Sequence, residues 1–128
     1  MSSSLPILVA IPNVEGSQVC EYLEHQGFSV VATHSQDETL AMLQERRDFR
    51  GVVILSEWAM ADEDNSTGGI IRLIQGKIPT VTIITETSRH QSGYRYMDEV
   101  FFPPSHDYVT TPFALEELAG RMRKVGMI

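Results

Sequence analysis

The sequence contains little cysteine and few basic residues, and each shortage excludes a class of protein. A single cysteine, Cys20, cannot form an internal disulfide, so the fold does not depend on cross-links. Ten Lys and Arg residues stand against seventeen Asp and Glu, and the net charge of −7 opposes binding to nucleic acid. No apolar run is long enough to cross a bilayer or to act as a signal peptide. We therefore expect a cytoplasmic protein with neither nucleic acid nor membrane as a partner.

The apolar residues gather in runs that have the length of buried strands. The 128 residues fit one domain, which we expect over 1–128 with a core from about 5 to 125. The apolar residues of these runs are continuous rather than alternating, which is typical of strands covered on both faces in a parallel sheet. The expected strands are 7–11, 28–32, 52–55 and 81–84, with a weaker fifth at 108–110.

Helical signals separate the first strands. Val19 and Leu23 share one face of a helix that Gly27 ends, because glycine readily adopts the left-handed conformation found after helices. Ser35 and Glu38 have the spacing of a capping box, which predicts that a second helix begins there. Strands that alternate with helices predict a doubly wound α/β fold.

The second half of the chain is less regular. A third helix is expected over about 69–75, and the clearest helix runs over 115–125, with acidic residues early and basic residues late. The segment 87–106 should hold a fourth helix, but Gly93 interrupts it and two prolines end it. We expect that helix to be distorted or shortened.

The order of these elements and the C-terminal stretch resemble the receiver domain of two-component response regulators. Tyr108, Thr111, Pro112 and Phe113 stand where that family has an aromatic residue, a residue that is usually Lys, and then Pro-Phe before an amphipathic helix. The resemblance covers nearly the whole chain. It implies a flavodoxin-like (CheY-like) five-stranded parallel sheet in the order 2-1-3-4-5, with a site beyond the carboxyl ends of strands one and three. It also implies a role in two-component signal transduction or a phosphorelay.

The charged residues on which the chemistry of that family depends are absent. In receivers, a pair of acids after strand one and an aspartate ending strand three hold Mg²⁺, and the aspartate accepts a phosphoryl group. Here Ile11 and Pro12, followed by Asn13, stand after strand one, Ser56 stands at the acceptor position, and Thr111 replaces the lysine. The four histidines show no zinc spacing. We therefore expect no metal, no cofactor and no enzymatic activity. A domain with the receiver fold but without the phosphorylation switch is called a pseudo-receiver.

Two further positions match receiver residues but have ordinary structural explanations. Thr85 resembles the hydroxyl residue that contacts the phosphoryl group in receivers, and Tyr108 matches the aromatic residue that changes rotamer on activation. For Thr85 we favour a hydroxyl bonded to the backbone. For Tyr108 we favour packing in the core over a switch.

Aromatic residues concentrate in one short stretch of the chain. Such residues and methionine are enriched at the centres of interfaces, so the stretch predicts contact with a protein partner or a homodimer. The competing explanation is that the rings fill the core beside a shortened helix. The residues are Tyr94, Tyr96, Met97, Phe101 and Phe102.

Two other functions remain open alternatives to a pseudo-receiver that binds proteins. A ligand sensor would hold a small molecule in the cleft between strands one and three, with Trp58 at its border. A divergent enzyme would use the hydroxyls of Ser56, Thr85 and Thr111, and it would need a base beside one of them.

Overall fold

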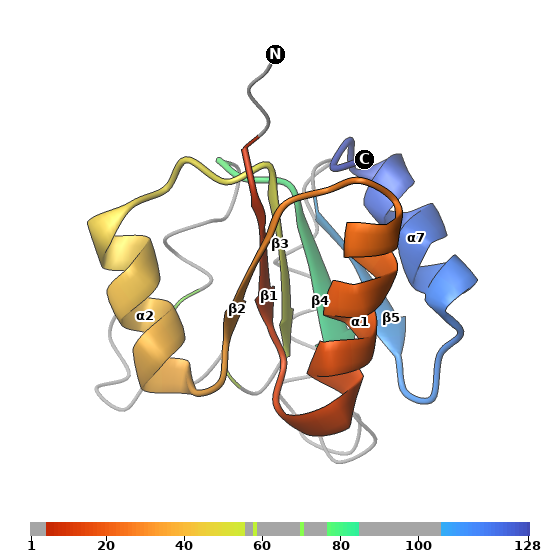
Figure 1. Cartoon of the computed structure of the whole chain (residues 1–128), viewed down its shortest axis with the longest axis horizontal. Helices are drawn as coiled ribbons and strands as arrows, with labels where there is room; N and C mark the ends of the chain where they lie inside the picture. Colours follow the sequence, from red (N-terminus) through yellow and green to blue (C-terminus); the bar gives the residue numbers. More distant parts are fainter. Residues whose placement is uncertain (1–4, 56–57, 59–69, 71–76, 85–105) are drawn as a thin grey trace.

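The computed structural model of the chain describes residues 5–55, 58, 70, 77–84 and 106–128, which form a five-stranded sheet with helices on both faces (Figure 1). The strands are β1 (Ile7–Ala10), β2 (Val30–Thr33), β3 (Gly51–Leu55), β4 (Thr80–Ile84) and β5 (His106–Thr110), and the helices are α1 (Asn13–His25), α2 (Gln36–Glu45) and α7 (Leu115–Lys124). The helix expected over 69–75 lies outside the described residues apart from Ile70, as does the segment 87–106 apart from its last residue.

All four strand pairings are parallel, and the strand order is β2-β1-β3-β4-β5. This is the 2-1-3-4-5 order that the family resemblance predicted. Ile7 at the beginning of β1 pairs with Val30 on one side and with Gly51 on the other, so β1 and β3 are neighbours in the middle of the sheet. Because the strands are parallel, their C-terminal ends lie together at one end of the sheet and their N-terminal ends at the other. We call these ends the carboxyl edge and the amino edge. They differ from the lateral edges, which the outer strands β2 and β5 form.

The core lies on both faces of the sheet, as the continuous apolar runs predicted. Every residue of β1, β3 and β4 is buried. Along β1, Ile7 and Val9 belong to the cluster on the face covered by α1 and α7, while Leu8 and Ala10 belong to the cluster on the face covered by α2. Neighbouring residues of a strand point to opposite faces, so a strand covered twice needs apolar residues throughout.

The end of α1 fixes where β2 begins. Gly27 has a φ of +93°, and the N–H of Phe28 donates a hydrogen bond of 3.1 Å to the carbonyl of Leu23 inside the helix. The predicted stop at Gly27 is therefore confirmed. Phe28 is still engaged with the end of α1, so β2 begins at Val30 and not at residue 28 as expected from the apolar run.

The beginning of α2 is held to the end of β2 by a small polar network. The Ser35 hydroxyl accepts a hydrogen bond of 3.1 Å from the N–H of Glu38, as the predicted capping box requires, and the Glu38 carboxylate accepts one of 2.7 Å from the N–H of His34. The Thr39 hydroxyl donates to the Ser35 carbonyl at 2.8 Å. Its 2.7 Å contact with Thr33 therefore has the Thr33 hydroxyl as donor, and this buried pair is satisfied.

The residues after α7 return to the amino edge of the sheet. Gly126 has a φ of +85°, and the N–H of Met127 donates a hydrogen bond of 2.9 Å to the carbonyl of Met122. The Met127 side chain is fully buried beside Gly51, so residues after α7 contribute to the hydrophobic core. The Arg50 guanidinium donates a hydrogen bond of 2.7 Å to the carbonyl of Met127.

The basic last turn of α7 contacts β5. Arg121 and Lys124 approach the carboxylate of Asp107 with N to O distances of 3.3 Å and 3.4 Å. Asp107 is buried, and it also accepts a hydrogen bond of 2.8 Å from the N–H of Tyr108. None of the helices in the ranges given above has the length and the apolar run that a membrane span needs.

Candidate functional site

Ile11 and Pro12 lie at the carboxyl edge, where the family resemblance places a site. The last residue of β1, Ala10, pairs with Ile54 of β3, and Ile11 follows directly. Pro12 is the N-cap residue of α1, and its side chain makes no capping hydrogen bond. The turn from β1 into α1 therefore presents no side-chain oxygen from either of the two residues that replace the acid pair.

Ile11 is an integral part of the core. Its side chain is 4% exposed and belongs to the cluster on the α1 and α7 face. A Cβ added at Gly16 would overlap the carbonyl oxygen of Ile11, so the first turns of α1 lie directly against the end of β1. A carboxylate at position 11 would be buried among apolar groups at a large desolvation cost. Sequence reasoning missed Gly16, because its requirement comes from a backbone contact.

Thr111 lies at the same edge, directly after β5. Its N–H donates a hydrogen bond of 3.0 Å to the carbonyl of Ile84, the last residue of β4, and the Thr111–Pro112 peptide bond is cis. The half-buried side chain carries no charge at neutral pH. This position therefore has no cation that would pair with a phosphoryl group.

Several predicted site residues fall outside the described residues. Ser56 follows Leu55 and Thr85 follows Ile84 in the sequence, but the structure places neither of them. The side chain of Asn13 is likewise not described, and neither is any residue of the aromatic stretch 94–102. Predictions about these positions remain predictions.

Trp58 lies at the carboxyl edge. It is half-buried and packs against both core clusters, which lie on opposite faces of the sheet. A side chain three residues past the end of β3 touches both clusters only if it lies beyond the strand ends. The indole therefore places apolar surface at the edge where a receiver needs charge.

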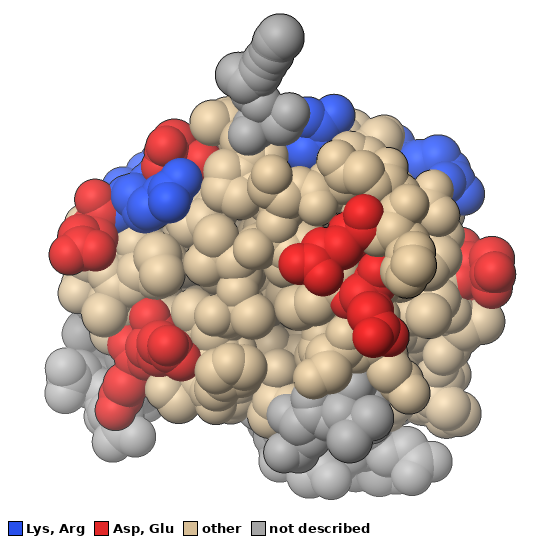
Figure 2. Space-filling model, viewed as in Figure 1, with Lys and Arg blue, Asp and Glu red and all other residues tan. Residues whose placement is uncertain are grey.

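The described cationic residues gather at the amino edge of the sheet. The described cationic residues come before β3 and β4 or near the helix C-termini, which places them at the amino edge, and blue side chains follow this edge in Figure 2. These are Arg46, Arg47, Arg50, Lys77, Arg121, Arg123 and Lys124. Among the residues placed by the structure, no three His, Cys, Asp or Glu side chains are grouped so that they could hold a metal ion.

Tyr108 packs as the sequence interpretation favoured. Its side chain is half-buried and lies against the cluster on the α2 face, on the strand that pairs with β4. The structure therefore gives the ring a role in the core. The expectation that the ring does not act as a switch remains a prediction.

A groove that sequence reasoning missed lies between α1 and β2, with a volume of about 270 Å³. Its floor is apolar and its rim carries the exposed carboxylates of Glu21 and Glu24; it is also lined by Val9, Ile11, Cys20 and Ala32. Burial, and secondly the negative charge of Glu24, raise the pKa of the Cys20 thiol, so the thiol is held in its neutral form. We call this feature the α1–β2 groove.

The fold has close counterparts among solved structures, although no protein-family model and no curated protein matches the sequence. A response regulator receiver protein from Sinorhizobium medicae has a TM-score of 0.71 at 18% identity, covering 96% of this chain and 94% of that one. For one from Pseudomonas putida the values are 0.67 and 16%, with 97% and 99% covered. The chain has the receiver-domain fold.

The receiver-domain fold also matches a structure that contains a metal. The receiver domain of a sensor histidine kinase from Pseudomonas aeruginosa, with a magnesium ion in its active site cleft, has a TM-score of 0.62 at 17% identity, covering 97% of this chain and 99% of that one. At identities this low, the structural matches establish only the architecture and the strand order. Any conclusion about the chemistry has to come from the residues at the carboxyl edge of this chain.

Proposed function

We propose that this chain is a pseudo-receiver: a signalling module with the receiver-domain fold that takes up no phosphoryl group, is not an enzyme, and acts by binding a protein partner or a second copy. Its setting would be a two-component regulatory system in the cytoplasm. The observation that carries the proposal is the buried Ile11 side chain at the position where receivers have an acid.

The residues present do not fit a magnesium site. Mg²⁺ requires nearly octahedral oxygen ligands and is usually held by one or two carboxylates. Ile11 and Pro12 supply none, and the indole of Trp58 packs at the same edge. Among the described residues at this edge, an ion would lose its water ligands without gaining charged ones in return.

The residues also do not fit phosphoryl transfer. The hydroxyl of Ser56 is a weak nucleophile unless a base removes its proton, and neither Ile11 nor Pro12 is a base. A phosphoryl group would also need a cation to balance its charge, and Thr111 has none. Neutral residues thus replace charged ones at the metal ligands, at the phosphoryl acceptor and at the cation that pairs with the phosphoryl group. Because all three are replaced, we infer that the whole reaction has been lost.

Loss of the reaction leaves binding as the function of the module. The aromatic stretch is the candidate surface, and its support is its composition, because aromatic residues and methionine anchor the centres of interfaces. The rings proposed to make the contact are those of Tyr94, Tyr96, Phe101 and Phe102, together with Met97.

Acetyl phosphate and Mg²⁺ provide a direct test of the lost reaction. The chain has one tryptophan, so the fluorescence of Trp58 reports on the carboxyl edge. We expect no phosphoryl adduct on Ser56 by mass spectrometry and no saturable change of Trp58 fluorescence during an Mg²⁺ titration. The matched variant Ser56→Asp restores the acceptor alone and should also stay unlabelled, because the acids that hold the metal are missing. Label on Ser56, or saturable Mg²⁺ binding, would contradict the proposal.

The interface is tested by the mass of the protein in solution and by partner capture. The double variant Phe101→Ser/Phe102→Ser should lower the mass of any oligomer to that of a monomer, or abolish binding of the partner. Leu5→Ser is the control, because Leu5 is an apolar side chain that is 44% exposed and lies outside the aromatic stretch. A monomer that binds its partner equally well with and without the two rings would refute this surface.

A further inference from the structure

The strand β2 forms an edge of the sheet and has backbone groups that face outward. It pairs with β1 on one side, where the N–H of Ile7 donates a hydrogen bond of 2.9 Å to the carbonyl of Ser29. Backbone groups of alternate residues point to alternate sides of a strand, so those of Val30 and Ala32 face away from β1. Within the described part of the chain, these N–H and C=O groups have no hydrogen-bond partner.

The side chains of β2 leave this edge accessible. Sheet edges are usually protected by a lysine, a proline, an inward-pointing charge or a bulge. The four residues of β2, Val-Val-Ala-Thr, include none of these residue types, and the pairing with β1 runs without a bulge. Ala32 is exposed, and Val30 and Val31 are half-buried. An extended peptide can therefore reach the strand.

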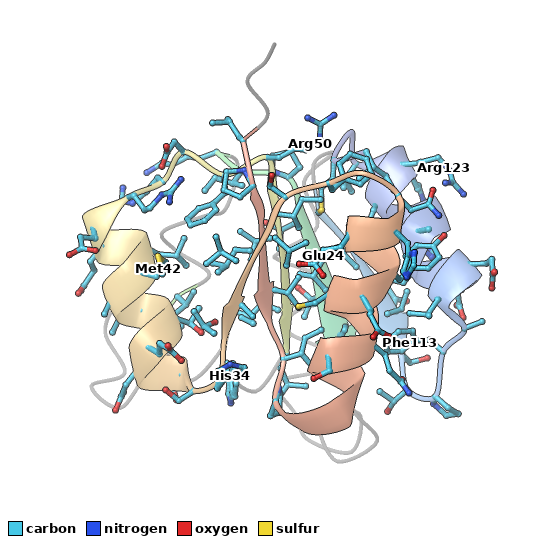
Figure 3. All side chains as sticks on the ribbon, viewed as in Figure 1. Glu24, His34, Met42, Arg50, Phe113 and Arg123 are labelled. Carbon is cyan, nitrogen blue, oxygen red and sulfur yellow. The ribbon has the colours of Figure 1, made fainter. Side chains whose placement is uncertain are left out.

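The surroundings of the edge select the charge of such a peptide. The α1–β2 groove runs beside β2, and Glu21 and Glu24 stand on its rim. Figure 2 shows uncharged surface over β2, with acidic side chains on its α1 side and near the beginning of α2, where Asp37 and Glu38 are exposed. Figure 3 shows Glu24 on α1 and His34 just past the end of β2. A strand lying here would be flanked by carboxylates on both faces of the sheet.

We propose that β2 accepts an extended basic segment of a partner protein, which adds a sixth strand to the sheet. The backbone of the segment would bond to the outward groups of Val30 and Ala32. Its Lys or Arg residues, at every second position, would lie along Glu21 and Glu24, because side chains on one face of a strand repeat with a period of two. This surface is separate from the aromatic stretch and from the carboxyl edge.

A second copy of the chain fits this edge less well than a basic partner does. Each copy carries a net charge of −7, and pairing two β2 strands would bring two sets of acidic rims together. Like charges placed opposite each other across strands are destabilising. Arg50 lies over the ring of Phe28, before the strand begins, and among the described residues neither Glu21 nor Glu24 forms an ion pair.

A short peptide tests the proposal with the full chain. The probe is an acetylated and amidated hexapeptide of alternating Lys and Val, titrated into the ¹⁵N-labelled protein at low salt. We expect saturable shifts of the amide signals of Val30 and Ala32, and slower alkylation of Cys20 in the groove. A fully N-methylated peptide keeps the charge but has no amide donors, and it should bind about tenfold more weakly or not at all.

Charge reversal supplies the matched pair of variants. Glu21→Lys/Glu24→Lys should weaken binding about tenfold, whereas Glu116→Lys/Glu117→Lys makes the same change of net charge on α7 and should leave affinity within about twofold. Equal effects of the two variants, equal binding of the N-methylated peptide, no binding, or dimerisation through β2 would each overturn the proposal. These readouts do not involve Ser56, so they are independent of the test for phosphoryl transfer.

Discussion

Gly51 and Met127 interlock, and the energy of this contact is open to measurement. A Cβ added at Gly51 would overlap the Cγ of Met127 and lie 2.5 Å from its sulfur. The backbone of Gly51 is not in the left-handed region, so alanine is conformationally permitted there. The obstacle to Gly51→Ala is therefore the methionine side chain and not the strand.

The structure predicts that the effect of Gly51→Ala on the free energy of unfolding depends on the residue at position 127, and that it can change sign. In the native chain, overlap with a buried side chain should cost about 1–3 kcal/mol of the free energy of unfolding. Met127→Ala alone should cost about 2–5 kcal/mol, because the side chain is fully buried. In that background the added methyl group enters vacated space, and alanine is about 0.5–1 kcal/mol better than glycine in a strand. Gly51→Ala should then be neutral or stabilising.

Urea unfolding of the four proteins in this double-mutant cycle gives the coupling free energy directly. We expect a coupling of about 1–3 kcal/mol between the two positions, in the range found for residues in contact. The slope of the transition should stay constant, so that shifts in midpoint report stability alone. If Gly51→Ala destabilised the protein equally with methionine and with alanine at position 127, the packing of the C-terminal residues against β3 would be refuted.

Two further predictions concern the first helix. Gly16→Ala should destabilise the chain by about 1–3 kcal/mol in thermal or urea unfolding, because its Cβ meets the backbone carbonyl of Ile11, and an unchanged midpoint would contradict that contact. Glu24→Gln should lower the pKa of the Cys20 thiol and speed its alkylation by iodoacetamide at fixed pH, since burial remains while the nearby negative charge is removed. Glu21→Gln is the control and should change the rate less; equal rates for both variants would count against the role of Glu24.

The sequence patterns correctly predicted those features of the fold that depend on residues close together in the chain, such as helix caps and helix ends. Ser35 and Glu38 form the expected cap, and Gly27 ends α1 in the expected left-handed conformation. The beginning of β2 was placed too early, because the apolar residue Phe28 reads as part of a strand while its N–H is bonded to the end of the helix. The apolar character of a residue does not show whether its backbone N–H is hydrogen-bonded in a strand or at the end of a helix.

The candidate site could be located from sequence but not described. The order of strands placed Ile11 and Thr111 at one edge, and the structure brings both there. The contact of Trp58 with both faces and the groove beside β2 depend on packing between segments far apart in the chain, which periodicity does not report. The exposed Ala32 is also unremarkable in sequence, and its meaning comes from its place on an edge strand.

Arg50 binds the chain near both of its ends at once. Its N–H donates a hydrogen bond of 2.8 Å to the carbonyl of Pro6, and its guanidinium donates to that of Met127. Attachment to a sensor chip or a bead through either terminus would thus orient the molecule in the same way, with the amino edge toward the support. Trp58 and the strand ends would face the solution, and both immobilised forms should give the same binding curves.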